Sequence, residues 1–258
     1  MELILLVLVS AMAPALLWMW VFYRQDKLEP EPPRIVWRMF WLGALSIIPA
    51  VILSGLLSIV FSLLGYLLLK VIPTSTWVES ATIVISGVYG AVLVAPIAEE
   101  IVKFLFLKRF AYPLEEFDEP MDGIVYGAAI GLGFAFVENL IFFANYGFEN
   151  VYLIRSALTM PAHALFCSFY GFALGIAKMD PDWDSRNFLR KALYSGIFFH
   201  FAYNLTALFN VFGALALLLI VIGMWRKVGV NILAAHSHSP HAKPESDVLE
   251  SPSKHDGI

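Results

Sequence analysis

Long apolar runs dominate this sequence and limit what the chain can fold into. A helix needs ~20 apolar residues to cross the ~30 Å hydrocarbon core of a bilayer. Seven runs come close to this length or exceed it, near residues 2–23, 41–69, 80–108, 122–146, 152–178, 190–209 and 211–226. Only 15% of the residues are charged, against about a quarter in soluble domains. The sequence therefore predicts an all-α, polytopic transmembrane bundle of about seven spans.

One boundary of this segmentation has two interpretations, and the basic residues predict the orientation. The break near Asn210 is short, so 190–226 could instead form one span and a re-entrant piece. Arginine and lysine gather in the odd-numbered connections and after the last run, whereas the second and fourth connections contain only Lys70 and Arg155. Because basic residues favour the cytoplasmic side, we expect an N-out, C-in orientation. The first run has no basic region before it, so we expect a retained span rather than a signal peptide.

The last residues differ in composition from the rest of the chain. We expect one transmembrane domain over 1–228 and a disordered, polar cytoplasmic tail over 229–258. The tail is rich in histidine, which favours a solvated segment more than a metal site. Its histidines are His236, His238, His241 and His255. The single cysteine, Cys167, lies in an apolar run and is predicted to be a small buried hydrophobe.

A few ionisable residues interrupt the predicted spans. Each costs at least ~2.5–3.5 kcal/mol in hydrocarbon, so such residues usually have a function. They are Glu99, Glu100, Lys103, Glu138, His163 and His200. We expect their side chains, from spans three to six, to face one bundle interior. Together they favour catalysis or metal binding over separate packing contacts.

The spacing of these residues predicts their directions. Glu99 and Lys103 are separated by four residues, the favourable order for a helical ion pair, and Glu100 points about 100° away from Glu99. Pro96 is placed to kink this helix. Glu138 has no opposite charge nearby in sequence and needs a partner from another helix.

Histidines and glycines complete the pattern. His163 follows Pro161, while His200 and Asn204 share one helical face. The glycines between 127 and 133 and between 171 and 175 allow close helix approach.

Four motifs in order resemble the PrsW family of intramembrane proteases, within the superfamily of CAAX prenyl endopeptidases and bacteriocin-processing Abi proteins. They are the acidic, proline-rich loop 26–32, EExxK at 99–103, FxxxE at 134–138 and HxxxN at 200–204. Asn204 stands where many members of the PrsW family have aspartate, and in this respect the chain is closer to the CAAX branch. The resemblance covers roughly residues 20–210 and implies an intramembrane endopeptidase.

The resemblance and the chemistry of peptide hydrolysis suggest roles for these residues. Glu99 would activate water, with Glu100 and Lys103 orienting it. His200 and Asn204 would stabilise the oxyanion, as the resemblance to the CAAX branch implies. Glu138 and His163 would orient the water or supply the proton.

A zinc-dependent arrangement is the alternative within the same activity. Glu138, His163 and His200 would then bind Zn²⁺, with Glu99 as the base. We favour the metal-free version because no HExxH-like pair is present.

The implied partners are the lipid bilayer and a membrane-anchored protein substrate, with regulatory proteins such as anti-sigma factors as candidates. We expect a prokaryotic cytoplasmic membrane as the location and no nucleic-acid partner. A proton- or ion-coupled transporter is the alternative from another class, since transporters also use buried ionisable residues. The sequence has no internal repeat of the kind common in transporters. A non-catalytic scaffold is disfavoured by the cost of the buried charges.

Overall fold

The described part of the chain is helical, as predicted. The computed structural model describes residues 2–71, 90–146, 152, 155–180 and 185–242. Over these residues it contains seven α-helices and two short π-helical segments, η1 and η2, and no strand. In chain order they are α1 (Glu2–Tyr23), α2 (Pro33–Val71), η1 (Gly90–Val94), α4 (Ala95–Phe110), α5 (Pro120–Tyr146), η2 (Arg155–Thr159), α7 (Met160–Met179), α8 (Ser185–Thr206) and α9 (Asn210–Ser237).

Five of these helical segments are long and apolar enough to cross a membrane. They are Ile4–Tyr23, Pro33–Leu67, Pro120–Asn145, Arg155–Met179 and Phe212–Ser237. The helix α4 has only 16 residues, and α8 begins with a polar stretch that contains three basic side chains. The chain is therefore a multi-pass membrane protein, and the predicted count of seven spans and the orientation stay predictions. The first part of the span expected at 80–108 lies outside the described residues.

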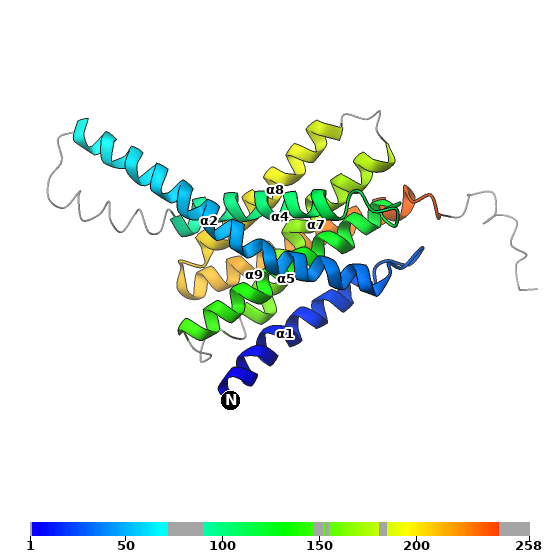
Figure 1. Ribbon diagram of the computed structural model, residues 1–258, viewed down its shortest axis with the longest axis horizontal. Helices are drawn as coiled ribbons and strands as arrows, with labels where there is room; N and C mark the ends of the chain where they lie inside the picture. The colour runs from blue at the N-terminus through cyan, green and yellow to red at the C-terminus, as the bar shows by residue number, and fades with distance from the viewer. Residues whose placement is uncertain (1, 72–89, 147–151, 153–154, 181–184, 243–258) are drawn as a thin grey trace, which may run out of the picture.

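Helices α5 and α7 form the centre of the bundle. They have the most extensive mutual contact, and α1, α2, α8 and α9 pack around them. In the most apolar stretch of α7, 94% of the residues are buried, whereas the figure is 6% in α2. The second half of α2 projects away from the other helices (Figure 1). Its exposed apolar side chains suit a lipid environment.

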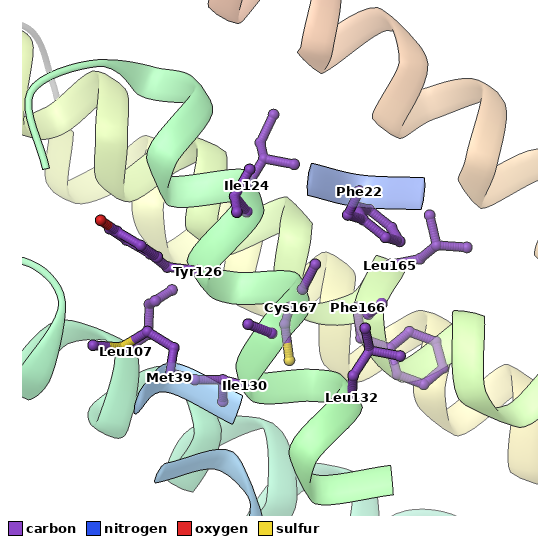
Figure 2. Packing of buried hydrophobic residues seen from close by; sticks show 14 of the residues in the cluster. Phe22, Met39, Leu107, Ile124, Tyr126, Ile130, Leu132, Leu165, Phe166 and Cys167 are labelled. Atoms are coloured by element: carbon purple, nitrogen blue, oxygen red, sulfur yellow. The ribbon is translucent and has the colours of Figure 1, made fainter. Parts of the chain in front are cut away.

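Small residues bring α5 and α7 close together, as the sequence predicted. A Cβ atom added at Gly123 would collide with the backbone of Gly171, and one at Gly131 would collide with the backbone of His163. Close backbone approach through small residues is typical of membrane helices. Around this seam, apolar side chains such as Ile130, Leu165 and Cys167 fill the core (Figure 2).

Two prolines follow π-helical turns. Pro96 lies at the start of α4, directly after η1, and Pro161 lies at the start of α7, directly after η2. A proline ring clashes with the carbonyl group four residues earlier, and in both helices that carbonyl lies within the π-helical turn. The wider turn accommodates the ring, and such turns are frequent at functional sites. The bend expected at Pro96 thus takes the form of a π-helical turn.

The helix α9 continues beyond residue 228, where the sequence predicted the membrane domain to end. It reaches Ser237 because Ile232 and Ala235 are apolar and pack into the core. The adjoining His241 then contacts Glu29 and Asp118 at 2.6 and 3.3 Å. The part of the predicted tail from 243 to 258 lies outside the described residues.

Candidate active site

Glu100 is the centre of a buried polar cluster. Its Oε1 atom accepts hydrogen bonds from Lys103 Nζ at 2.5 Å and from His200 Nδ1 at 2.8 Å. Its Oε2 atom accepts one from the Tyr170 hydroxyl group at 3.1 Å. The side chains of Glu100 and Lys103 are fully buried. Since both carboxylate oxygens have donors, Glu100 is suited to holding its neighbours in place.

Glu138 joins the cluster through His163. Lys103 Nζ lies 3.2 Å from His163 Nδ1, and His163 Nε2 lies 3.0 Å from Glu138 Oε2. An ammonium group can only donate, so His163 Nδ1 accepts and Nε2 carries the hydrogen that faces Glu138. Glu138 also pairs with Arg155 at 2.9 Å. The need for a partner from another helix, predicted for Glu138, is therefore met by two side chains.

Glu99 differs from Glu100 in its surroundings. Its Oε2 atom is buried and has no hydrogen-bond partner, while the side chain as a whole is 17% exposed. This oxygen lies 3.9 Å from Lys103 Nζ and 3.8 Å from His200 Nε2. The closer ion pair of Lys103 is thus with Glu100, although the sequence favoured Glu99. Glu100 is fully buried, so its carboxylate depends more on the neutralising ammonium group of Lys103. Glu99 retains an oxygen that can accept a proton.

Aromatic rings surround the two imidazoles. The Phe166 ring stacks on His200 with centroids 4.7 Å apart, and the Phe134 ring stacks on His163 at 5.7 Å. The ammonium group of Lys103 lies 4.5 Å from the centroid of the Phe134 ring. Both rings are buried. They limit the access of water and strengthen the electrostatic interactions inside the cluster.

The predicted site residues come from four helices. Glu99, Glu100 and Lys103 lie on α4, Glu138 on α5, His163 on α7, and His200 and Asn204 on α8. The first six meet in one cluster through the contacts described above. Asn204 lies one turn beyond His200 and is half-buried. The catalytic roles given to these residues stay predictions.

Two members of the cluster were missed by the sequence reasoning. Arg155 was counted as a loop residue, yet it lies in η2 and its Nε atom donates to Asn139 at 2.6 Å. Tyr170 was passed over as an aromatic residue in an apolar helix. Its position seven residues after His163 was the available signal, because that spacing places both on one helical face.

The zinc ligands proposed from the sequence fit a metal only in part. His200 fits, because its Nδ1 donates to Glu100 and leaves Nε2 to face a metal ion, a common arrangement for histidine ligands. His163 does not fit, because its Nδ1 accepts from Lys103 and its Nε2 faces Glu138 with a hydrogen.

The spacing of donor atoms agrees with this view. Within the described ranges, sets of three donor atoms that lie within 4.8 Å of one another occur at two other places. The set of Glu138, His163 and His200 is not one of them.

The fold and the cluster define a multi-pass membrane protein with carboxylates, imidazoles and cationic groups gathered inside its helix bundle. Residues 31–228 match the model of the PrsW family intramembrane metalloprotease. The chain belongs to this family, and it is therefore an intramembrane protease.

Similar bacterial proteins support the same assignment. Protease PrsW of Geobacillus kaustophilus is 36% identical over 172 residues, which cover 66% of this chain and 67% of the relative. Protease PrsW of Bacillus subtilis is 30% identical over 203 residues, which cover 78% and 83%. Protease PrsW of Oceanobacillus iheyensis is 29% identical over 229 residues, which cover 87% and 96%. No solved structure matches the chain at a significant level.

Proposed function

We propose that the protein hydrolyses peptide bonds of membrane-anchored proteins with a water molecule activated by Glu99. The observation that carries this proposal is the unpartnered Oε2 atom of Glu99. Lys103 and His200 flank it at 3.9 and 3.8 Å. A general base needs a free lone pair within reach of its proton. Glu99 has one, whereas the oxygens of Glu100 are both occupied.

The proposed reaction begins when water adds to the scissile carbonyl carbon. Glu99 accepts the proton that the water loses, and the carbonyl oxygen becomes an oxyanion. Breakdown of the tetrahedral intermediate breaks the carbon–nitrogen bond, and the same proton passes to the leaving amine. Glu100 and Lys103 fix the base in position through their buried ion pair. No step of this reaction runs through a metal.

The oxyanion needs hydrogen-bond donors or positive charge close to the carbonyl oxygen. Asn204 supplies a donor from α8, and His200 supplies one through Nε2 when its imidazole is protonated, in the roles that the family resemblance implies. Arg155 adds a permanent positive charge beside Glu138, with its Nη2 atom 2.9 Å from Glu138 Oε1. Glu138 is 34% exposed and, with His163, is placed to orient the water or transfer the proton.

The proposed substrates are polypeptides anchored in the same bilayer, because the cluster lies inside a bundle of membrane helices. Regulatory proteins such as anti-sigma factors are the candidates that the family resemblance suggests. The bacterial relatives support a cytoplasmic membrane as the location.

A reconstituted assay tests this function. The purified protein is placed in liposomes with a single-span substrate, and the products are identified by mass spectrometry. We expect cleavage by the unchanged protein, none by Glu99→Gln, and full cleavage by Glu115→Gln, which alters an exposed glutamate outside the cluster. Cleavage retained in Glu99→Gln would reject the role of Glu99. Proton-driven solute uptake without cleavage by any variant would reject the proposed hydrolysis.

A further inference from the structure

A second group of carboxylates is buried where the first loop meets the beginning of α5. Asp26 and Glu31 lie in the loop between α1 and α2, Glu119 directly precedes α5, and Asp122 lies in its first turn. Each of the four residues is at most 4% exposed. Carboxylate oxygens of Asp26, Glu119 and Asp122 lie within 4.8 Å of one another. We call these four residues the loop carboxylate cluster.

Hydrogen bonds fix three of the four carboxylates by one oxygen each. Asp26 Oδ2 accepts from the backbone N–H of Glu31 at 3.0 Å. Asp122 Oδ2 accepts from the backbone N–H of Glu119 at 2.7 Å. The hydroxyl group of Tyr126 donates to Glu31 Oε2. The loop and the helix are thus held together in a defined arrangement.

Four of the five remaining oxygens of the cluster have no donor. Asp26 Oδ1, Glu31 Oε1 and both carboxylate oxygens of Glu119 are buried without a hydrogen-bond partner. Glu119 itself is 0% exposed, and its carboxylate is directed at those of Asp26 and Asp122. A buried carboxylate without a donor or a counter-charge is strongly unfavourable. The arrangement therefore requires something that neutralises it.

No basic side chain within the described ranges forms an ion pair with the cluster, although Lys178 and His241 lie close enough for longer-range electrostatic interactions with Asp122 and Glu119. Nearby, Arg34 pairs with Glu116 at 3.6 Å, and His241 pairs with the exposed Glu29 and Asp118. None of the ion pairs among the described residues involves a member of the loop carboxylate cluster. Without a direct ion pair, protons or a bound cation are the remaining close sources of neutralisation.

We propose that the loop carboxylate cluster binds one divalent cation of the hard, oxygen-preferring class, Ca²⁺ or Mg²⁺. Oxygen ligands lie about 2.3–2.6 Å from Ca²⁺, so two ligands of one ion are separated by at most about 5 Å. The three gathered oxygens satisfy this limit. The cluster contains no histidine or cysteine, the residues that would favour zinc or copper.

The electrostatics of the loop agree with a missing positive charge. Burial raises the pKa of Asp26 to about 7, and the neighbouring charge of Glu119 adds to the shift. Burial likewise raises the pKa of Glu31 to about 7. Removal from water disfavours the charged carboxylate unless a positive partner is present.

This cation site is separate from the proposed catalytic cluster. Asp122 and Glu138 lie on the same helix, and their separation of sixteen residue steps corresponds to about 24 Å at the usual helical rise. A bound ion would tie the first loop to the beginning of α5, the helix that carries Glu138. The proposal does not depend on the proposed reaction.

Equilibrium dialysis with radioactive calcium tests the proposal on the full-length protein in detergent, with Mg²⁺ as the competitor. We expect saturable binding of one ion per chain and a higher melting temperature with the ion present. Glu119→Gln should weaken binding at least tenfold, whereas the exposed neighbour Glu115→Gln should leave it unchanged. Asp26→Asn, a change in the loop, replaces Glu119→Gln if that variant does not fold.

The variant His241→Ala distinguishes ion binding to the loop carboxylate cluster from ion binding to the nearby exposed group of Glu29, Asp118 and His241. Binding that persists in His241→Ala and is lost in Glu119→Gln supports the buried site. Absence of saturable binding to the unchanged protein would mean that protons neutralise the cluster, and would overturn the proposal. Loss of binding in His241→Ala, or full binding in both Glu119→Gln and Asp26→Asn, would overturn it too.

Discussion

Glu99 and Glu100 are adjacent and chemically identical, but the structure predicts different effects when each is changed to glutamine. Glu100→Gln removes the charge that neutralises Lys103 at 2.5 Å, and the ammonium group is fully buried. Breaking one partner of a buried ion pair costs about 3–5 kcal/mol. The Glu99 oxygen facing Lys103 has no hydrogen bond to lose, and its distance to Nζ is 3.9 Å. Its replacement should cost about 1 kcal/mol or less, as for a weak, partly exposed pair.

The free energy of unfolding in mixed detergent micelles measures this difference, and a cleavage assay runs beside it. Both variants should lose proteolysis. Glu99→Gln removes the base, and Glu100→Gln removes the carboxylate that accepts hydrogen bonds from Lys103 and His200. Only Glu100→Gln should lower the unfolding free energy by several kcal/mol. Equal destabilisation by the two changes, or a larger loss in Glu99→Gln, would refute the division of roles.

Three further predictions follow from individual contacts. Tyr170→Phe removes one donor to Glu100, so the unfolding free energy should fall by about 1.5–3 kcal/mol; an unchanged value would contradict that hydrogen bond. Gly131→Leu forces a side chain against the backbone of His163 and should cost at least about 1–3 kcal/mol and most of the cleavage rate. Gly223→Ala is its control, because nothing lies within 4 Å of the added Cβ; equal effects would contradict the close packing. A zinc-selective chelator should leave cleavage unchanged; stoichiometric zinc whose removal abolishes cleavage would reject the metal-free reaction.

The sequence was sufficient for the helical fold and for finding the charged residues within it. Apolar runs identify membrane helices because each must satisfy its own backbone hydrogen bonds in lipid. Glu138 and the two histidines were recognisable because ionisable groups are costly in hydrocarbon. The glycines of α5 and α7 also indicated where the backbones come close.

Contacts between distant segments could not be predicted in the same way. Whether Lys103 forms its closer ion pair with Glu99 or with Glu100 depends on which carboxylate is buried deeper, and that burial is a property of the assembled bundle. Arg155 lies near a span boundary, where a basic residue normally faces water, and only the packed fold places it beside Glu138. The neighbours of Asp26 at the beginning of α5 are almost a hundred residues away and carry no pattern that links them to the loop.

The central claim is that carboxylates and imidazoles from four helices meet inside the bilayer, and solid-state NMR can measure this directly. Carbon–nitrogen dipolar recoupling between labelled glutamate carboxyl and histidine ring atoms reports their distances in lipid. We predict strong couplings of Glu100 to His200 and of Glu138 to His163, whose nearest atoms are 2.8 and 3.0 Å apart, and a weaker coupling between Glu99 and His200 at 3.8 Å. The Glu138–His163 signal should vanish in Glu138→Gln, and the Glu100–His200 signal should persist. Absence of these couplings in the folded, reconstituted protein would contradict the account.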